Sequence, residues 1–341
     1  MEEAVATAEM DLPSMNGRAE PHGARRQGMS GMRAMCWLIL AGSLFAVVSP
    51  WLARLWIGFD LFTQLLPHMA ALALAASICL LWGGRAGVLA GIMVVAGTVA
   101  GLAWLSLSHI SPGFQRRTDA NVLRVMSFNL WRENDQVEAV EREIRRNLPD
   151  IVALPEFEKE EMYSLPARLK DILPYRADCL HKEHCYLGLV SRWPIVRVKS
   201  ASLWEGPPYL HAWVKTPRGM VHVYVTHTLR APWIRSHYRQ VKALARIVHL
   251  RHGEPAIVMG DFNAAPFSYI LGLFPRKTGL VRHTWLPSWP VRPLKMPQIA
   301  IDHVFTSSHF ALRRGPWVGR DAGSDHLPVV LELHWRAAPV R

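Results

Sequence analysis

Gly260-Asp261-Phe262-Asn263 directly follows the apolar run Ala256-Ile257-Val258-Met259, so a carboxylate and a carboxamide stand where a buried strand is predicted to end. Open α/β sheets place ligand sites at the carboxyl ends of their strands. Asp261 and Asn263 are two residues apart, and an extended backbone would direct both side chains to one side. Asp, Asn and Gly also form ordinary turns. The tetrapeptide therefore indicates a functional strand end only in combination with similar features elsewhere.

Polar side chains adjoin five further short runs that are apolar or alternating and are typical of strands. These residues are Asn129 after 125–128, Glu156 after 151–155, His227 after 221–226, Asp302 within 301–305, and Asp325 with His326 before 327–333. Taken singly, such a residue is more often a cap or a turn residue than a catalytic one. Together, the six strand ends indicate one common site.

The chain resembles the endonuclease/exonuclease/phosphatase superfamily, which includes DNase I-like nucleases, abasic-site endonucleases, inositol polyphosphate phosphatases and neutral sphingomyelinases. The resemblance spans about residues 122–334 and rests on six motifs in the family's order. They are Ser127-Phe128-Asn129, Pro155-Glu156, Thr226-His227, Gly260-Asp261-Phe262-Asn263, Ile301-Asp302-His303 and Ser324-Asp325-His326. Residues 188–195 are similar to the family's mid-domain strand and turn. The resemblance implies an α/β (α+β) fold, a four-layer sandwich of two packed mixed β-sheets flanked by helices.

The resemblance also implies a divalent cation, Mg²⁺ or Mn²⁺. Glu156 would be its direct ligand, because hard cations take carboxylate oxygens and Mg²⁺ keeps several waters. Asn129 and Asp325 would complete the metal side, either directly or through water. Chelation should then abolish activity.

The remaining motif residues would act on the substrate. By resemblance, Asp261 would orient and deprotonate the attacking water as a general base, and Asn263 would hold a phosphoryl oxygen. His326 would donate to the phosphate, with its tautomer and orientation fixed by Asp302. His227 would assist the phosphate or the leaving oxygen, although no carboxylate partner for it is evident in the sequence.

Three long apolar stretches precede this region, at residues 35–53, 61–82 and 86–107. Each is near the length of about 20 residues that a helix needs to cross a bilayer. Small residues dominate the second and third stretches, as helix packing in lipid favours, and tryptophans lie near several ends. A signal peptide followed by a soluble helical domain is the alternative. A signal peptide is short and single, so three successive runs favour three membrane spans.

The predicted organisation has four parts: a disordered tail at 1–33, three transmembrane helices at 34–108, a linker at 109–120 and the catalytic domain at 121–336. Within the domain, 134–147 and 234–250 place apolar residues on one helical face. Residues 275–297 are rich in Pro, Trp and basic residues and show no period, so we predict a long loop. In the superfamily such loops shape substrate choice, although Trp285 and Trp289 could simply pack there.

Charge separates the two halves of the chain. The net charge of +12 lies wholly beyond residue 110, because the first 110 residues hold six Lys and Arg against six Asp and Glu. A basic domain suits a polyanionic partner, such as nucleic acid or an anionic lipid surface. Membrane-attached domains are also often basic without a specific ligand.

The cations that flank the stretches predict the orientation of the chain in the membrane. Four arginines before the first stretch and Arg85 oppose Arg54, Arg116 and Arg117, which favours an inside amino terminus. We therefore expect an integral protein of a bacterial inner or cell membrane, with its catalytic domain on the extracytoplasmic side.

Two cysteines bear on the same question. Cys179 and Cys185 share one polar loop and could form a disulfide in an oxidising compartment, remain free thiols, or bind zinc together with His181 and His184. A disulfide would support the extracytoplasmic placement.

The sequence thus predicts a membrane-anchored, metal-dependent phosphoesterase that hydrolyses a phosphodiester by attack of water on phosphorus, as a nuclease does. A lipid-headgroup phosphodiesterase of the sphingomyelinase type, or a phosphatase, is the alternative. A membrane scaffold without catalysis is a third possibility, although every matched position holds a chemically competent residue. No protein partner can be inferred.

Overall fold

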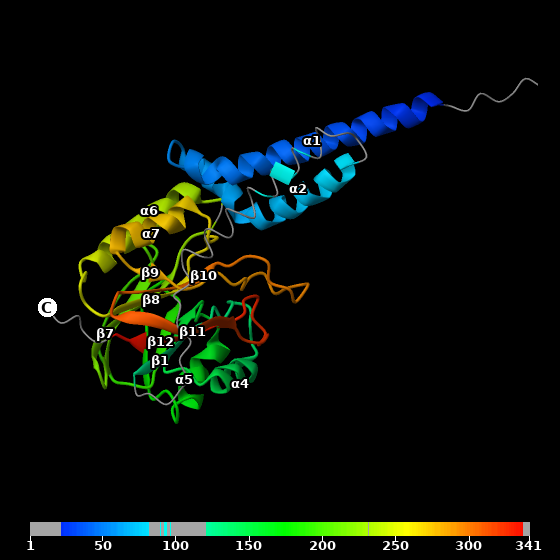
Figure 1. Cartoon of the computed structure of the whole chain (residues 1–341). Coiled ribbons are helices and arrows are strands. Elements are labelled where there is room, and N and C mark those ends of the chain that lie inside the picture. The colour runs from blue at the N-terminus through cyan, green and yellow to red at the C-terminus, as the bar shows by residue number, and fades with distance from the viewer. Residues whose placement is uncertain are drawn as a thin grey trace, which may run out of the picture.

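The computed structural model describes residues 22–81, 121–230 and 232–336, together with four positions between 89 and 96 (Figure 1). The N-terminal part contains helix α1 (His22–Leu52), the 3-10 helix η1 (Ile57–Leu65) and helix α2 (Leu66–Leu81). Helices α1 and α2 pack against each other through small and apolar side chains, among them Leu40, Ala73 and Ala76. Close packing through small residues is typical of helices in lipid.

Two segments of this part are long and apolar enough to cross a membrane, at Gly31–Leu52 and Ile57–Leu80. Length and composition alone carry this assignment, which makes it weak evidence for an anchor. The third predicted stretch, 86–107, and the predicted linker, 109–120, lie almost entirely outside the described residues. Helix α1 begins at His22, so residues 22–33 are helical although we predicted them to be disordered. A helix extends readily from a formed segment, because each added residue gains one hydrogen bond after nucleation.

Twelve strands form two six-stranded sheets. The first sheet has the order β11-β12-β1-β2-β4-β3 and the second the order β5-β6-β7-β8-β10-β9. The strands of the first sheet are β1 (Val122–Ser127), β2 (Ile151–Pro155), β3 (Tyr175–Asp178), β4 (Leu187–Ser191), β11 (Phe310–Val318) and β12 (Val329–Trp335). Those of the second are β5 (Ile195–Ala201), β6 (Tyr209–Thr216), β7 (Gly219–His227), β8 (Ala256–Asp261), β9 (Val281–Arg282) and β10 (Asp302–Thr306). Both sheets are mixed, because β1 runs parallel to β2 and β7 parallel to β8, while the other pairings are antiparallel.

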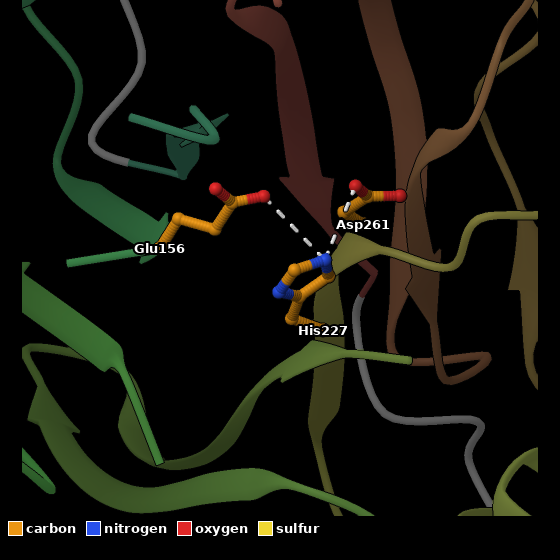
Figure 2. Close-up of side chains that lie close together, drawn as sticks. All are labelled: Glu156, His227 and Asp261. Atoms are coloured by element: carbon orange, nitrogen blue, oxygen red, sulfur yellow. Dashed lines mark ion pairs between the residues drawn. The ribbon is translucent and has the colours of Figure 1, made fainter. Parts of the chain in front are cut away.

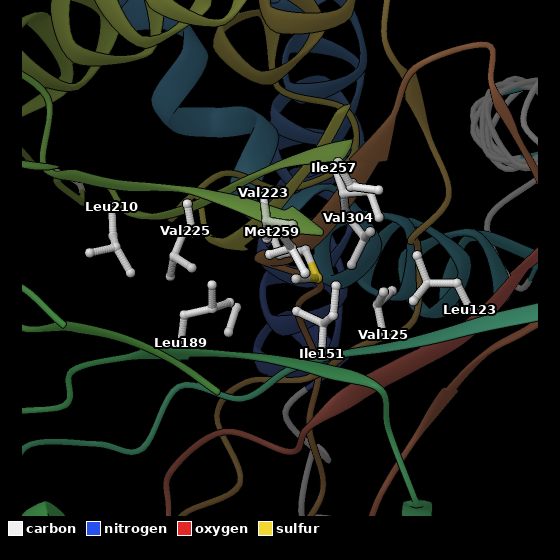
Figure 3. Packing of buried hydrophobic residues seen from close by; sticks show 14 of the residues in the cluster. Leu123, Val125, Ile151, Leu189, Leu210, Val223, Val225, Ile257, Met259 and Val304 are labelled. Carbon is white, nitrogen blue, oxygen red and sulfur yellow. The ribbon is translucent and has the colours of Figure 1, made fainter. Parts of the chain in front are cut away.

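The two sheets face each other across a buried apolar layer (Figure 3). Alternate residues of one strand serve different layers: Val125 points into the space between the sheets, whereas Met126 points toward the helices outside. This alternation follows from the period of two in a strand. It explains why the central strands are apolar on both faces.

Helices cover both outer faces. The first sheet carries α4 (Val137–Asn147), η2 (Glu160–Ser164) and α5 (Leu165–Arg168), and the second carries α6 (Ile234–His249) and α7 (Tyr269–Thr278). The result is the predicted sandwich of two mixed sheets between helices. Helices α4 and α6 lie where the apolar periodicity predicts them.

One predicted loop is shorter than expected. Helix α7 continues through Pro275 to Thr278, and β9 follows, so the irregular segment begins only after Arg282 and not at residue 275. Leu271 and Phe274 are buried and belong to the apolar layer between α7 and the second sheet. This packing outweighs the loss of the hydrogen bond that a proline cannot donate.

The N-terminal part docks against the catalytic region through η1 (Figure 1). The buried Asp60 carboxylate accepts hydrogen bonds from Ser268 Oγ (2.6 Å) and from the backbone N–H groups of Tyr269 (2.6 Å) and Ile270 (3.3 Å). Asp60 therefore satisfies N–H groups at the start of α7 that the helix itself leaves free. Gln64 Oε1 accepts a further bond from Ala265 N at 2.7 Å.

Candidate active site

All the predicted strand-end residues lie at the same end of the sandwich. In the second sheet, His227 is paired with Asp261 across β7 and β8, and Asp261 is paired with Asp302 across β8 and β10. In the first sheet, Asn129 and Glu156 follow the parallel strands β1 and β2. Because parallel strands end at the same edge of a sheet, these residues meet across the gap between the two sheets.

Asp261 is the residue that most contacts share. Its Oδ2 accepts a hydrogen bond from Asn129 Nδ2 at 3.1 Å and lies 3.6 Å from His227 Nε2 and 3.7 Å from His326 Nε2. Its Oδ1 accepts a bond from Asn263 N at 2.7 Å. The Asp261 side chain is almost completely buried. A single carboxylate is thus held between two imidazoles and one amide.

Figure 2 shows His227 between two carboxylates that belong to different sheets. His227 Nε2 lies 3.6 Å from Glu156 Oε1 and 3.6 Å from Asp261 Oδ2. Asn129 Nδ2 also donates to Glu156 Oε1 at 3.0 Å, and Arg132 N donates to Glu156 Oε2 at 3.0 Å. The partner of His227 that sequence alone did not reveal is therefore this pair of acids.

A second chain of contacts holds His326. Its Nδ1 lies 2.7 Å from Asp302 Oδ2, and Ser288 Oγ donates to the same oxygen at 2.6 Å. His326 is buried, so the bond to Asp302 fixes which ring nitrogen faces Asp261. Ser288 belongs to the segment predicted as a long loop, and no motif in the sequence singles it out.

The surroundings of Asp261 and Glu156 shift the pKa values of the two carboxyl groups in opposite directions. Burial raises the pKa of Asp261 to about 6, although the charges of His326 and His227 act in the opposite direction. For Glu156, burial acts to raise the pKa, but the charge of His227 and the hydrogen bonds from Asn129 and Arg132 outweigh it and lower the pKa. One carboxylate is thus poised to take a proton near neutral pH while the other remains ionised.

The basicity of His326 follows from its acidic neighbours. Burial alone would lower the pKa of His326, but the charge and hydrogen bond of Asp302, with the charges of Asp261 and Asp325, raise it to about 10. His326 is therefore cationic at neutral pH and can donate from both ring nitrogens.

The backbone takes uncommon conformations where it aims these side chains. Glu156 has φ 53° and Asn263 has φ 46°, both in the left-handed region. A non-glycine residue there costs energy, and such strain is often found at functional sites. Gly260 has φ 144°, and a Cβ at this position would lie 1.9 Å from the carbonyl oxygen of Thr226. Glycine is therefore required where β8 passes close to β7 and enters the site.

Asn263 is anchored by a residue that sequence analysis did not identify. Its Nδ2 donates to the carbonyl oxygen of Thr228 at 2.8 Å, and Thr228 Oγ1 donates to the carbonyl oxygen of Phe262 at 2.6 Å. An amide nitrogen carries two hydrogens, so one bond to Thr228 leaves a second hydrogen on Asn263. Thr228 directly follows His227, so its two hydrogen bonds hold the loop that carries Asn263 against the end of β7.

Asp325 adds a further carboxylate to the site, with its Oδ1 3.9 Å from His326 Nε2. Trp289 Nε1 donates to Asp325 Oδ2 at 3.0 Å, whereas the buried Asp325 Oδ1 has no hydrogen-bond partner in the described part of the chain. Burial raises the pKa of Asp325, because it disfavours the charged form of the carboxylate. Carboxylate oxygens are the ligands that Mg²⁺ prefers, so the residues present fit such an ion.

The side-chain groupings that could hold a metal differ from the predicted metal set. Glu156, His227 and Asp261 form one such group, and Asp261, Asp302 and His326 form another. Asn129 turns its Nδ2 toward both Glu156 and Asp261, while its Oδ1 accepts from Trp131 N at 2.9 Å. In this arrangement Asn129 orients two acids and does not present its oxygen to them.

The family model for endonuclease/exonuclease/phosphatase proteins matches residues 126–326, a range that includes every residue of this site. The chain belongs to the endonuclease/exonuclease/phosphatase family. It is accordingly a hydrolase that acts on phosphoester bonds, in a family that depends on divalent metal ions. A search of curated protein sequences finds no match.

Solved structures show the same fold at low sequence identity. The crystal structure of SmcL is 14% identical, with a TM-score of 0.52, covering 63% of this chain and 100% of SmcL. An endonuclease/exonuclease/phosphatase family protein from Bacteroides thetaiotaomicron is 17% identical, with a TM-score of 0.50, covering 64% of this chain and 100% of that chain. At this identity the likeness concerns the fold alone.

Cys179 and Cys185 form a disulfide, with Cα atoms 5.6 Å apart. Of the three states that the sequence allowed for this pair, the structure has the disulfide. The disulfide closes the loop after β3, at the same end of the sandwich as the site.

Proposed function

We propose that the protein is a membrane-anchored, divalent-metal-dependent phosphodiesterase in which Asp261 activates the attacking water. The observation that carries the proposal is the position of Asp261 Oδ2, which Asn129, His227 and His326 approach from three directions within 3.7 Å. A general base needs an acceptor atom that its surroundings orient and a pKa near the working pH. Asp261 meets both conditions.

The other residues would bind and polarise the phosphodiester. His326, held through Nδ1 by Asp302, donates from Nε2 to a phosphoryl oxygen and stabilises the charge that develops there. Asn263 donates its free amide hydrogen to a second phosphoryl oxygen. His227 donates to the phosphate or to the leaving oxygen. Asn129 donates to both Glu156 and Asp261 and so fixes the positions of their carboxylates.

Glu156 and Asp325 would hold the divalent cation, Mg²⁺ or Mn²⁺. When bound, such an ion neutralises negative charge on the phosphoryl oxygens. The support for this assignment is the low pKa of Glu156 and the unpartnered Oδ1 of Asp325. Trp289 orients Asp325, as residues around a metal ligand commonly do.

The docking of η1 supports a membrane-anchored topology with three spans. The two candidate spans, Gly31–Leu52 and Ile57–Leu80, meet at the end where η1 contacts the domain. If both segments cross the bilayer, this end lies on the same side as the domain. The chain must then cross once more between α2 and residue 121, and the apolar stretch 86–107 is long enough to do so. The disulfide favours the extracytoplasmic side for the domain, because disulfides persist in oxidising compartments.

A nucleic-acid phosphodiester is the leading substrate class because of the basic domain, and one contact favours a lipid headgroup as the alternative. His68 of α2 lies 2.6 Å from Gln298 through Nε2 and Oε1. Gln298 follows Trp289 in the irregular segment, which also exposes Leu294 and Met296. This contact joins the irregular segment to a candidate span, which supports a position of the site near a bilayer surface.

The proposal is tested with the purified full-length chain in detergent. Hydrolysis of bis(p-nitrophenyl) phosphate should require Mg²⁺ or Mn²⁺, stop with EDTA and return when the metal is restored. Hydrolysis that persists in EDTA would contradict the proposal. Plasmid DNA and phosphatidylcholine vesicles, offered separately, distinguish the two substrate classes.

A further inference from the structure

A cavity of about 280 Å³ lies between the C-terminal end of α1 and helix α7, and none of its lining residues belongs to the candidate active site. Its walls include Trp51 and Arg54 from the α1 side and Tyr269, Arg276 and Arg282 from the catalytic side. Three arginines from separate segments of the chain thus line one cavity.

The cations that line the cavity have no acidic counterpart there. Among the described residues, no Asp or Glu lines the cavity, and none forms an ion pair with Arg54, Arg276 or Arg282. The carboxylate of Asp60 reaches Ser268 and Tyr269 from the η1 side, but its hydrogen bonds go to hydroxyl and backbone groups. The lining therefore offers cationic donors without a carboxylate among them, which suits an anion.

Arg282 provides the second observation. It is only 5% exposed, its Nη1 donates to the carbonyl oxygen of Pro266 at 3.0 Å, and its Nε has no hydrogen-bond partner in the described part of the chain. A buried charged group with an unmade hydrogen bond is costly. An oxyanion in the cavity would supply the missing acceptor.

Arg276 is positioned by its surroundings. Its guanidinium lies over the ring of Tyr269, 5.3 Å from the ring centroid, and a Cβ at Gly272 would lie 2.9 Å from its Nη1. The absence of a side chain at Gly272 therefore lets Arg276 lie close along α7. Arginine forks match the geometry of phosphate oxygens, which a planar guanidinium can bind in pairs.

We propose that this cavity binds a phosphate group through Arg54, Arg276 and Arg282, as a site separate from the catalytic one. The phosphate is carried by the headgroup of an anionic phospholipid or is free in solution. The end of α1 favours the lipid, since Trp51 is exposed at the end of a candidate span, where tryptophan is enriched at membrane interfaces. That preference rests on the proposed membrane anchor, whereas the phosphate site itself does not.

The test measures thermal unfolding of the full-length chain in a neutral detergent with EDTA present, so that no turnover occurs. Dihexanoyl phosphatidylglycerol, dihexanoyl phosphatidylcholine and inorganic phosphate are titrated separately at constant ionic strength. A ligand that binds only the folded chain raises the unfolding temperature, and at equal concentration a tighter ligand raises it further. A shift with phosphatidylglycerol alone assigns the lipid headgroup, and a comparable shift with inorganic phosphate assigns free phosphate.

The matched variants decide whether the arginines are responsible. In the double variant Arg54→Gln with Arg276→Gln, both side chains are exposed, so the fold should persist while the apparent Kd rises about tenfold or more. The control double variant, Arg246→Gln with Lys277→Gln, removes the same charge outside the cavity and should bind as the unaltered chain does.

Gly272→Ala keeps the charge and displaces Arg276, so it should also weaken binding. Equal shifts in all four proteins, or no shift with phosphatidylglycerol or inorganic phosphate, would overturn the proposal. Phosphodiesterase activity measured in parallel with Mg²⁺ fails or succeeds independently of this result.

Discussion

At the scale of single residues, the sequence predicted which residues form the site better than it predicted which residues hold them in place. The motif order identified Asp261, His227 and His326, and the structure brings them together. The sequence could not identify Ser288 or Thr228, because each acts through a hydrogen bond to a segment that is distant in sequence. Residues of this kind carry no local pattern, since serine and threonine are common in loops for ordinary reasons.

Replacement of Asp261 by Asn tests the base directly. The amide keeps the shape but cannot accept the proton, so we expect turnover of bis(p-nitrophenyl) phosphate to fall by roughly 10²- to 10⁴-fold. Glu133→Gln, which alters an exposed carboxylate outside the site, should leave the rate unchanged. An Asp261→Asn variant that folds and turns over normally would remove Asp261 from the mechanism.

Trp289→Phe tests the support of the proposed metal ligand. The substitution removes the donor to Asp325 Oδ2 and keeps an aromatic ring. Loss of such a supporting bond typically weakens metal binding about 10- to 100-fold, so the Mg²⁺ concentration for half-maximal activity should rise. The matched control is Trp285→Phe, the same substitution in the same segment, which leaves the bond from Trp289 to Asp325 in place. An unaltered Mg²⁺ dependence in Trp289→Phe would mean that Asp325 does not bind the ion.

At the scale of elements, the apolar runs predicted β1, β2, β7, β8, β10 and β12 and the helices α4 and α6, because their apolar residues recur as burial in a strand or a helix requires. They did not predict β3, β5, β6, β9 or β11. They also did not predict that α7 would pass through Pro275. The sequence also gave no sign that Asp60, between the first two apolar stretches, accepts hydrogen bonds from the first turn of α7. Such a contact between distant elements depends on tertiary packing alone.

Asp60→Ala should therefore destabilise the catalytic domain even though Asp60 lies outside it. Loss of an acceptor at a helix start, where the bonds are buried, costs about 2 kcal/mol. Denaturant unfolding of the full-length chain in detergent, followed at the tryptophans, measures the change. Asp135→Ala, at an exposed position, should change the free energy of unfolding by about 0.5 kcal/mol or less. Equal free energies of unfolding for Asp60→Ala and the unaltered chain would show that the contact between η1 and α7 does not stabilise the domain.

At the scale of the whole molecule, stability should depend on pH through buried neutral histidines. Burial lowers the pKa of His237 to about 4 and that of His303 to about 3. An unfolded histidine titrates near 6.5. As the pH falls below about 6.5, protons bind the unfolded chain first, so the free energy of unfolding should decrease steadily toward pH 4.

His237→Gln should lessen this loss of stability between pH 7 and pH 5, because the substituted side chain does not titrate. His249→Gln, on the same helix but exposed, should retain the full dependence. The unfolding midpoint as a function of pH provides the measurement. Identical pH profiles for the two variants would assign the acid sensitivity to other groups.

The interlock between η1 and α7 limits how the protein can be divided. A protease that cut between α2 and Asn121 would separate the hydrolase domain from Asp60, the acceptor for its own α7, and from Gln64, which contacts Ala265. Grafting the hydrolase onto an unrelated anchor would have the same effect. The N-terminal helices and the hydrolase domain should therefore be expressed and purified as one piece.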